Sequence, residues 1–224
     1  MAEWELVGRE GFQALKVRLS RGETVTVESG SFLLSRGNIE VRTTTGGLLS
    51  GVLRALAGGE SVFLNEIRAT GDVAEVWIAP PTPGDIAAVE LTGQPLIIQD
   101  SSYLAHIGDV RVSVAWRGLK GLLAEGELVW LKAEGSGTVF INSFGSIERI
   151  ELAPGERVTV DNWHFVAMDS TVRYDVRKFG GWKTFILGGE GLVVEVEGPG
   201  RIWVQTRNVE GFAGILRRFI PVRG

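Results

Sequence analysis

A pattern of about 20 residues occurs three times along the chain, and it constrains the fold more than any other feature. Each copy begins with a turn glycine, has apolar residues three and five positions later, and an aromatic residue at the tenth position. Apolar residues follow at positions 11, 12, 17 and 19, and the copies align without a gap. The glycines are Gly22, Gly93 and Gly155, and the aromatic residues are Phe32, Tyr103 and Phe165. This agreement predicts one body built from three like units.

A second repeated segment follows each copy and is typical of a hairpin. It opens with a Gly-Glu pair, alternates polar and apolar residues, passes a glycine-containing turn and ends in a strand centred on an aromatic residue. The glutamates are Glu60, Glu127 and Glu190, and the aromatic residues, 63 positions apart, are Trp77, Phe140 and Trp203. The predicted units are therefore about 1–78, 79–141 and 142–208, followed by a tail at 209–224.

The residue pattern favours β structure. Val, Ile, Leu and aromatic residues alternate at period two, and the chain has 31 glycines for tight turns. Helical spacing of leucines predicts one short helical connector at 48–57. We therefore expect an all-β sandwich or β-roll in each unit. Units of this size leave sheet edges exposed, which like units can cover by pairing, first within the chain and then between chains.

Composition excludes several classes of chemistry. The chain has no cysteine, which rules out disulfides, thiolate catalysis and cysteine-containing zinc sites. Its N-terminus lacks a signal peptide pattern, and no apolar run approaches the roughly 20 residues that cross a bilayer. A net charge of −4 argues against a general nucleic-acid binder. We expect a cytoplasmic protein, peripheral to a membrane if it contacts one.

Four segments together resemble a known family. They are GGEGLVV at 188–194, GPGRIWVQTRN at 198–208, GSGTVFIN at 135–142 and PGERVTVDN at 154–162. The chain is similar, over nearly its whole length, to the altered-inheritance-of-mitochondria protein family, which is largely uncharacterised in bacteria and archaea.

The resemblance implies a fold and an assembly. It implies a double-stranded β-helix in each unit, like that of the tryptophan-dependent RNA-binding attenuation protein (TRAP), and a homotrimer whose nine units form a ring. It brings no catalytic residues. We therefore expect an all-β, three-repeat, TRAP-like protein.

The two histidines do not mark a repeated site. His106 and His164 fall at different positions of the pattern, so a site built three times would not use both. Asp161, His164 and a serine could form a hydrolase triad, but no Gly-x-Ser-x-Gly motif accompanies them. We interpret both histidines as ordinary sheet residues and predict no enzyme activity, no cofactor and no metal site.

The repeated glutamates have two interpretations. Carboxylates on a ring could bind hard cations through oxygen. Alternatively each glutamate caps its own hairpin turn by accepting backbone N–H groups or pairs with an arginine, and it repeats because the turn repeats. We favour the second interpretation.

RNA binding in the manner of TRAP would need a basic residue at a fixed position of each unit. The polar positions one and six residues after the turn glycines are instead acidic or neutral: Glu23, Gln94 and Glu156, then Glu28, Gln99 and Asp161. A small-ligand or RNA-binding ring is therefore our alternative function, and nucleic acid is not an expected partner.

Basic residues concentrate in the connectors and the tail. They are Arg54, Arg117, Lys120, Lys178, Lys183, Arg217 and Arg218, and in the tail they accompany apolar residues. This basic and apolar rim predicts docking on an anionic membrane surface or an acidic protein partner. The other interpretation is that these segments cover the ends of the β-core or the trimer interface. The function we expect is that of a ring-forming scaffold or binding protein.

Overall fold

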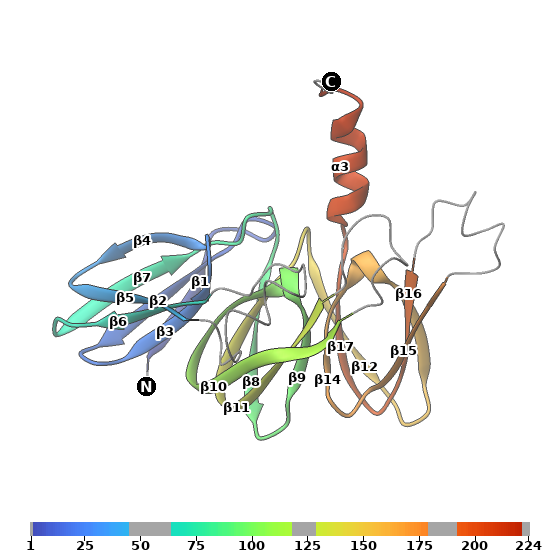
Figure 1. Ribbon diagram of the computed structural model, residues 1–224, viewed down its shortest axis with the longest axis horizontal. Coiled ribbons are helices and arrows are strands. Elements are labelled where there is room, and N and C mark those ends of the chain that lie inside the picture. The colour runs from blue at the N-terminus through green and yellow to red at the C-terminus, as the bar shows by residue number, and fades with distance from the viewer. Residues whose placement is uncertain (1, 45–63, 118–128, 179–191, 221–224) are drawn as a thin grey trace.

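The computed structural model describes residues 2–44, 64–117, 129–178 and 192–220, and Figure 1 shows them as an all-β protein. The expected fold class is confirmed. The predicted helical connector at 48–57 lies outside the described residues. The strands fall into three sets that follow one another along the longest axis of the molecule (Figure 1).

The first set has two layers. β2 (Ala14–Ser20), β7 (Val73–Ile78) and β4 (Phe32–Arg36) are neighbours in one sheet, and β1 (Glu3–Val7) extends it beyond β2. We call this four-stranded sheet the first end sheet. In the other layer β3 (Thr24–Glu28) pairs with β6 (Leu64–Ala69), which pairs with β5 (Ile39–Thr44).

The third set repeats this order. β12 (Ile147–Leu152), β17 (Gly200–Gln205) and β14 (Phe165–Asp169) form one layer. β13 (Arg157–Asp161), β16 (Leu192–Glu197) and β15 (Arg173–Lys178) form a separate three-stranded sheet, which we call the second end sheet.

In the middle set two long strands serve both layers. β10 (Tyr103–Arg117) and β11 (Val129–Asn142) pair along their whole length, with β8 (Ile86–Thr92) beside the second half of β11 and β9 (Leu96–Gln99) beside its first half. Gly108 of β10 lies opposite Gly137 of β11, at the point where the two long strands pass from one layer to the other. The φ angle of Gly108 is 94°. A Cβ on Gly108 would lie 2.8 Å from the Cα of Gly137, so only glycine permits this close approach.

Alternating apolar residues of the strands form three buried clusters. The first cluster packs the first end sheet against β3, β6 and the middle set, with Leu15, Val76 and Val25 fully buried. Strands of all three sets pair into one ten-stranded sheet, which runs from β12 to β5. The second cluster is formed by side chains of this sheet alone. The third packs that sheet against the second end sheet, where Trp130 stacks on Phe165 with ring centroids 5.0 Å apart.

The repeated turn glycines precede β3, β9 and β13. Gly22, Gly93 and Gly155 have φ of 86°, 97° and 79°, the left-handed conformation that glycine adopts without a steric penalty. A non-glycine residue would be strained at each of these turns.

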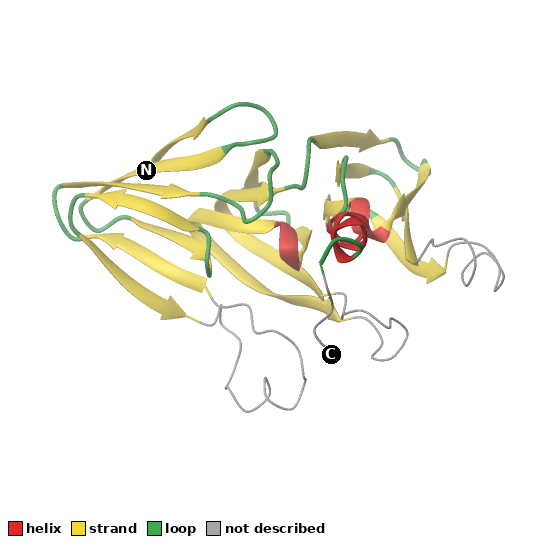
Figure 2. Cartoon of the chain, turned by 90° about the horizontal axis from the view of Figure 1, so that it is seen from above, coloured by secondary structure: helices red, strands yellow, loops and turns green. Residues whose placement is uncertain are grey.

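The chain closes with α3 (Val209–Arg217), which rises from the sheets in Figure 1 and is seen end-on in Figure 2. Two short 3-10 turns, η1 (Asp100–Ser102) and η2 (Asn162–His164), precede β10 and β14. Among the described residues no helix is long and apolar enough to cross a membrane.

Candidate functional site

Two strand edges lie at opposite ends of the molecule. β4 is the last strand of the first end sheet, and β13 is the last strand of the second. Within the described parts of the chain, neither strand has a second pairing neighbour. The first end sheet lies at the blue end of Figure 1 and the second at the opposite, red end. One chain therefore cannot pair its own two edges.

The inner joints between strand sets share one register. At the first joint β3 pairs with β10, and Val27 faces Ala105. At the second joint β9 pairs with β14, and Ile98 faces Ala167. Both joints place the fifth residue after a turn glycine opposite the twelfth residue of the following copy of the pattern.

The two open edges carry the same two positions of the repeated pattern that meet at the inner joints, the fifth on β13 and the twelfth on β4. Val160 of β13 is the fifth residue after Gly155, and Leu34 of β4 is the twelfth after Gly22. If β13 of one copy paired with β4 of another in the same register, Val160 would face Leu34 and Thr159 would face Ser35. A strand edge of this kind is a ready template for another chain.

Burial differs sharply between the open edge and its inner counterparts. Tyr103, Leu104 and Ala105 of β10 are 0% exposed, as are Phe165, Val166 and Ala167 of β14. The equivalent residues of β4 are exposed: Phe32 by 45%, Leu33 by 52% and Leu34 by 36%. Three consecutive apolar residues thus face solvent on β4, which pairs only with β7 among the described residues.

Burial also differs between β12 of the third set and its counterparts in the other two sets. Ile150 of β12 is 36% exposed, whereas its counterparts by strand register, Val17 and Val89, are 0% and 3% exposed. Trp77 is partly exposed on the first end sheet, while Phe140 and Trp203 at the equivalent positions are buried. The three predicted aromatic positions therefore occupy equivalent strands, and the first of them lacks a covering layer.

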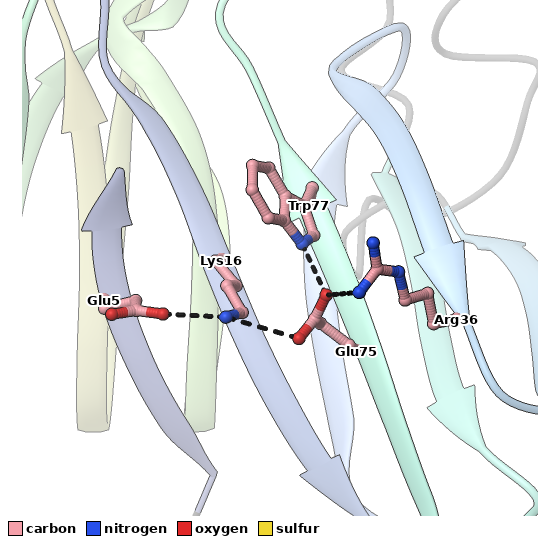
Figure 3. A network of polar contacts seen from close by, with 5 residues as sticks. All are labelled: Glu5, Lys16, Arg36, Glu75 and Trp77. Atoms are coloured by element: carbon pink, nitrogen blue, oxygen red, sulfur yellow. Dashed lines mark hydrogen bonds and ion pairs between the residues drawn. The ribbon is translucent and has the colours of Figure 1, made fainter. Parts of the chain in front are cut away.

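A row of charged side chains crosses the outward face of the first end sheet beside Trp77 (Figure 3). Lys16 Nζ lies 2.8 Å from Glu5 Oε1 and 3.3 Å from Glu75 Oε2. Glu75 Oε1 accepts a hydrogen bond from Trp77 Nε1 at 2.8 Å and lies 3.9 Å from Arg36 Nη1. The row thus links β1, β2 and β7 to the open edge strand β4.

These contacts shift the pKa values of two members of the row. The hydrogen bond from Trp77, with the nearby Lys16, lowers the pKa of Glu75. Hydrogen bonds to Glu5 and Glu75 raise the pKa of Lys16. Both shifts favour the charged forms. An open groove of about 400 Å³ lies over this face, lined by Trp4, Arg18 and other side chains of the sheet.

Both histidines make structural contacts. His106 Nδ1 lies 2.8 Å from the Tyr103 hydroxyl, and burial lowers the pKa of His106 to about 4. His164 Nδ1 lies 2.7 Å from the Gln205 carbonyl oxygen. Asp161, weighed as a triad member, accepts a hydrogen bond from the backbone N–H of Trp163 instead.

A half-buried carboxyl group lies near the first joint. Burial, with a smaller contribution from Asp100, raises the pKa of Glu28 to about 8. Burial, with a smaller contribution from Glu28, raises the pKa of the Tyr103 hydroxyl, which is fully buried. The neutral forms of these groups are therefore favoured at this joint.

Helix α3 exposes an apolar face. Phe212, Ile215, Leu216, Phe219 and Ile220 in and after the helix are between 40% and 79% exposed. Asn208 fixes the start of the helix, because its Oδ1 accepts from Gly211 N at 2.6 Å while its Nδ2 lies 3.0 Å from His164 Nε2. Phe212 contacts Phe144 at the base of the helix, with centroids 5.5 Å apart.

The predicted rim and turn carboxylates are only partly described. Arg217 is the last residue of α3 and Arg218 is its C-cap. Arg117 and Lys178 end β10 and β15, and their side chains lie outside the described set. The remaining rim and turn residues lie outside the described residues altogether: Arg54, Lys120, Lys183, Glu60, Glu127 and Glu190. Among the residues that the structure describes, no group of three or more histidines and carboxylates is placed to hold a metal ion.

Sequence reasoning did not find the charged row. Glu75 and Arg36 are far apart in the sequence, and only the pairing of β4 with β7 brings them together. The available signal was weak: both residues point outward on alternating strands, as ordinary solvated charges do.

The geometry defines a class of protein: an all-β chain of stacked sandwiches in which, among the described residues, β4 in the first set and β13 in the third are edge strands of their end sheets. The chain belongs to the family described as Mitochondrial biogenesis AIM24, whose profile matches residues 4–207, and this confirms the resemblance noted above. It is 32% identical over 219 residues to an uncharacterised protein of Streptococcus pyogenes serotype M6, covering 94% of this chain and 88% of that protein. A crystal structure of a Streptococcus pyogenes protein is similar with a TM-score of 0.84 and 32% identity, covering 98% of this chain and all of the other.

Proposed function

We propose that this protein is a self-assembling scaffold whose copies join head to tail into a closed ring. The observation that carries the proposal is the exposure of Phe32, Leu33 and Leu34 on β4, where both inner joints bury the equivalent residues completely. Burying such apolar side chains against a partner is favourable by about 25 cal/mol per Å². A head-to-tail contact between two different edges also closes into a ring when the rotation permits.

The match between the open edges and the register of the inner joints supports the same head-to-tail ring. Pairing β13 with β4 of the next copy would extend the two end sheets into one sheet, as the inner joints do. It would also place Trp77 of one copy over Ile150 of the other, since Phe140 and Trp203 take the equivalent places in the inner clusters. The family resemblance supplies the copy number of three.

Native mass spectrometry of the purified full chain tests the proposal. The expected result is a mass of three chains, and a Leu34→Asp variant should shift the population to single chains because it places an unpaired charge in the joint. Phe12→Asp is a matched control, because Phe12 is 74% exposed in the turn before β2. Wild-type protein that stays monomeric at micromolar concentration would contradict the ring.

We further infer that the scaffold docks on an anionic membrane surface through α3. The supporting observation is that no residue of α3 is buried, although Phe212, Ile215 and Leu216 form an apolar face that ends in Arg217 and Arg218. An amphipathic helix with arginines beside apolar residues suits the interface of an anionic bilayer. A ring would present several such helices together, which multiplies weak binding.

Liposome co-sedimentation separates this surface from other occupants. Full-length protein should pellet with phosphatidylglycerol vesicles at low salt, less with phosphatidylcholine vesicles, and not after Ile215→Glu and Leu216→Glu. Ala213→Gln is the matched control on the same helix. Absence of binding to anionic vesicles would exclude the membrane and leave an acidic protein as the partner to be sought by the same variants.

A further inference from the structure

The Arg36–Glu75 pair has a counterpart of opposite sign in the third strand set. By strand register Glu75 corresponds to Arg201 and Arg36 corresponds to Asp169. Arg201 donates to Asp169 through Nε at 2.8 Å and through Nη2 at 2.9 Å, so the pair is bidentate. The two sets thus use the same place for an ion pair and exchange which strand carries which charge.

The surroundings of the two pairs also correspond. Arg201 lies over the Trp203 ring at 5.1 Å, and Lys16 lies over the equivalent Trp77 ring at 5.8 Å. Lys16 is matched in the third set by Arg149, because each faces the tryptophan of its own set in the strand register. Both ion pairs thus lie beside a tryptophan with a cation over its ring, but that cation is Arg201 of the pair itself in the third set and Lys16 of the neighbouring strand in the first.

The two pairs differ in what covers them. Asp169 faces Leu96 across the second joint and is only 9% exposed, so its ion pair is held within a completed joint. Arg36 is on the open edge, its side chain is 78% exposed, and its nitrogen is 3.9 Å from Glu75. The first joint carries Ile107 at the same position, opposite Val25.

We propose that the Arg36–Glu75 pair is the specificity determinant of the contact between copies, and that the incoming β13 of the next copy covers it as β9 covers Asp169. This inference rests on the proposed ring. Covering one charge without its partner is strongly unfavourable, whereas a covered, bonded pair is tolerated, so such pairs discriminate between correct and incorrect partners. Because one inner joint carries the opposite polarity and the other carries an isoleucine, the open edge is electrically distinct from both.

A charge-exchange experiment on the full chain tests this inference. Self-association is measured by sedimentation velocity for the wild type, for Arg36→Asp, for Glu75→Arg, and for the double variant that reproduces the third set. Each single variant should weaken self-association by at least about 30-fold, since it covers unpaired or like charges. The double variant should recover to within about threefold of the wild type, because the Asp169–Arg201 arrangement already fits this backbone.

The controls separate the possible failures. Arg21→Asp disrupts an exposed ion pair with Asp72 on a turn and should not alter association. Circular dichroism and thermal melts identify any variant that fails to fold. A wild type that assembles while both single variants assemble equally well overturns the specificity determinant and leaves the ring intact. A double variant no better than the singles also overturns it, and a monomeric wild type removes the ring and this inference together.

Discussion

Replacing Glu28 by glutamine is expected to stabilise the protein increasingly as the pH rises. The pKa of Glu28 is raised from an ordinary value of 4.5 to about 8, chiefly by burial and further by Asp100. A folded-state pKa above the unfolded value means that the folded protein binds the proton more tightly. The contribution of Glu28 is therefore fully present below about pH 4.5 and is lost as the pH rises through 8. The Glu28→Gln side chain is neutral throughout and avoids this loss.

The size of the effect follows from the shift. Each pKa unit corresponds to about 1.4 kcal/mol, so a shift of this size sets a ceiling of roughly 4 kcal/mol on the change between pH 5 and pH 8. Glu28 is only partly buried, and local relaxation admits water, so we expect about 2 kcal/mol. For a chain of this length, that corresponds to a gain of roughly 4–8 °C in Tm for the variant at pH 8 relative to its gain at pH 5.

Thermal unfolding at fixed protein concentration, followed from pH 5 to pH 9, measures this difference. Asp100→Asn should narrow it, because Asp100 contributes to the raised pKa of Glu28. Glu10→Gln, in an exposed turn, is the matched control. Parallel pH profiles for the wild type and Glu28→Gln would refute the reasoning, since they would mean that folding does not change the proton affinity of this carboxyl group.

Three further predictions concern burial, capping and acid stability. Phe165→Ala should cost about 3–5 kcal/mol by denaturant unfolding, whereas Phe32→Ala in dilute, monomeric protein should cost about 1 kcal/mol, because only Phe165 is buried. Equal costs would contradict this difference. Asn208→Ala should weaken the start of α3 by about 1 kcal/mol, measured as faster hydrogen exchange at Gly211, while Asn208→Asp keeps the acceptor and should not. Burial lowers the pKa of His106 to about 4, so the contribution of this neutral side chain to folding stability is lost as the pH falls from about 6.5 toward 4. His106→Gln should remove about 2 kcal/mol of that acid destabilisation, measured by thermal melts.

The repeated pattern predicted most of the strands, because alternation of apolar residues depends only on neighbouring positions. It located β7, β11 and β17 from Trp77, Phe140 and Trp203, and the turns at the repeated glycines. It could not show that β10 and β11 each continue through both layers. Gly108 and Gly137 read as turn residues in a sequence, yet here they permit two continuous strands to bend together.

The candidate site was harder to predict, because it depends on differences between equivalent positions. Phe32 matches Tyr103 and Phe165 in the pattern, and nothing local distinguishes a position at an inner joint from one at an open edge. The order of strands in the sheets makes that distinction. Likewise Arg36 and Glu75 are ordinary surface charges in the sequence, and the role that we propose for them follows only from comparison with Asp169 and Arg201.

The continuous strands of the middle set bear on how the molecule carries mechanical load. A pull on β5 reaches the middle set through β6, β3 and β10, and from there it runs along unbroken covalent backbone in β10 and β11. Hydrogen bonds between strands share such a force, while the two long strands resist hinging at the centre. We therefore expect the middle set to resist bending and to hold the angle between the first and third sets, which would contribute to the curvature of any larger assembly.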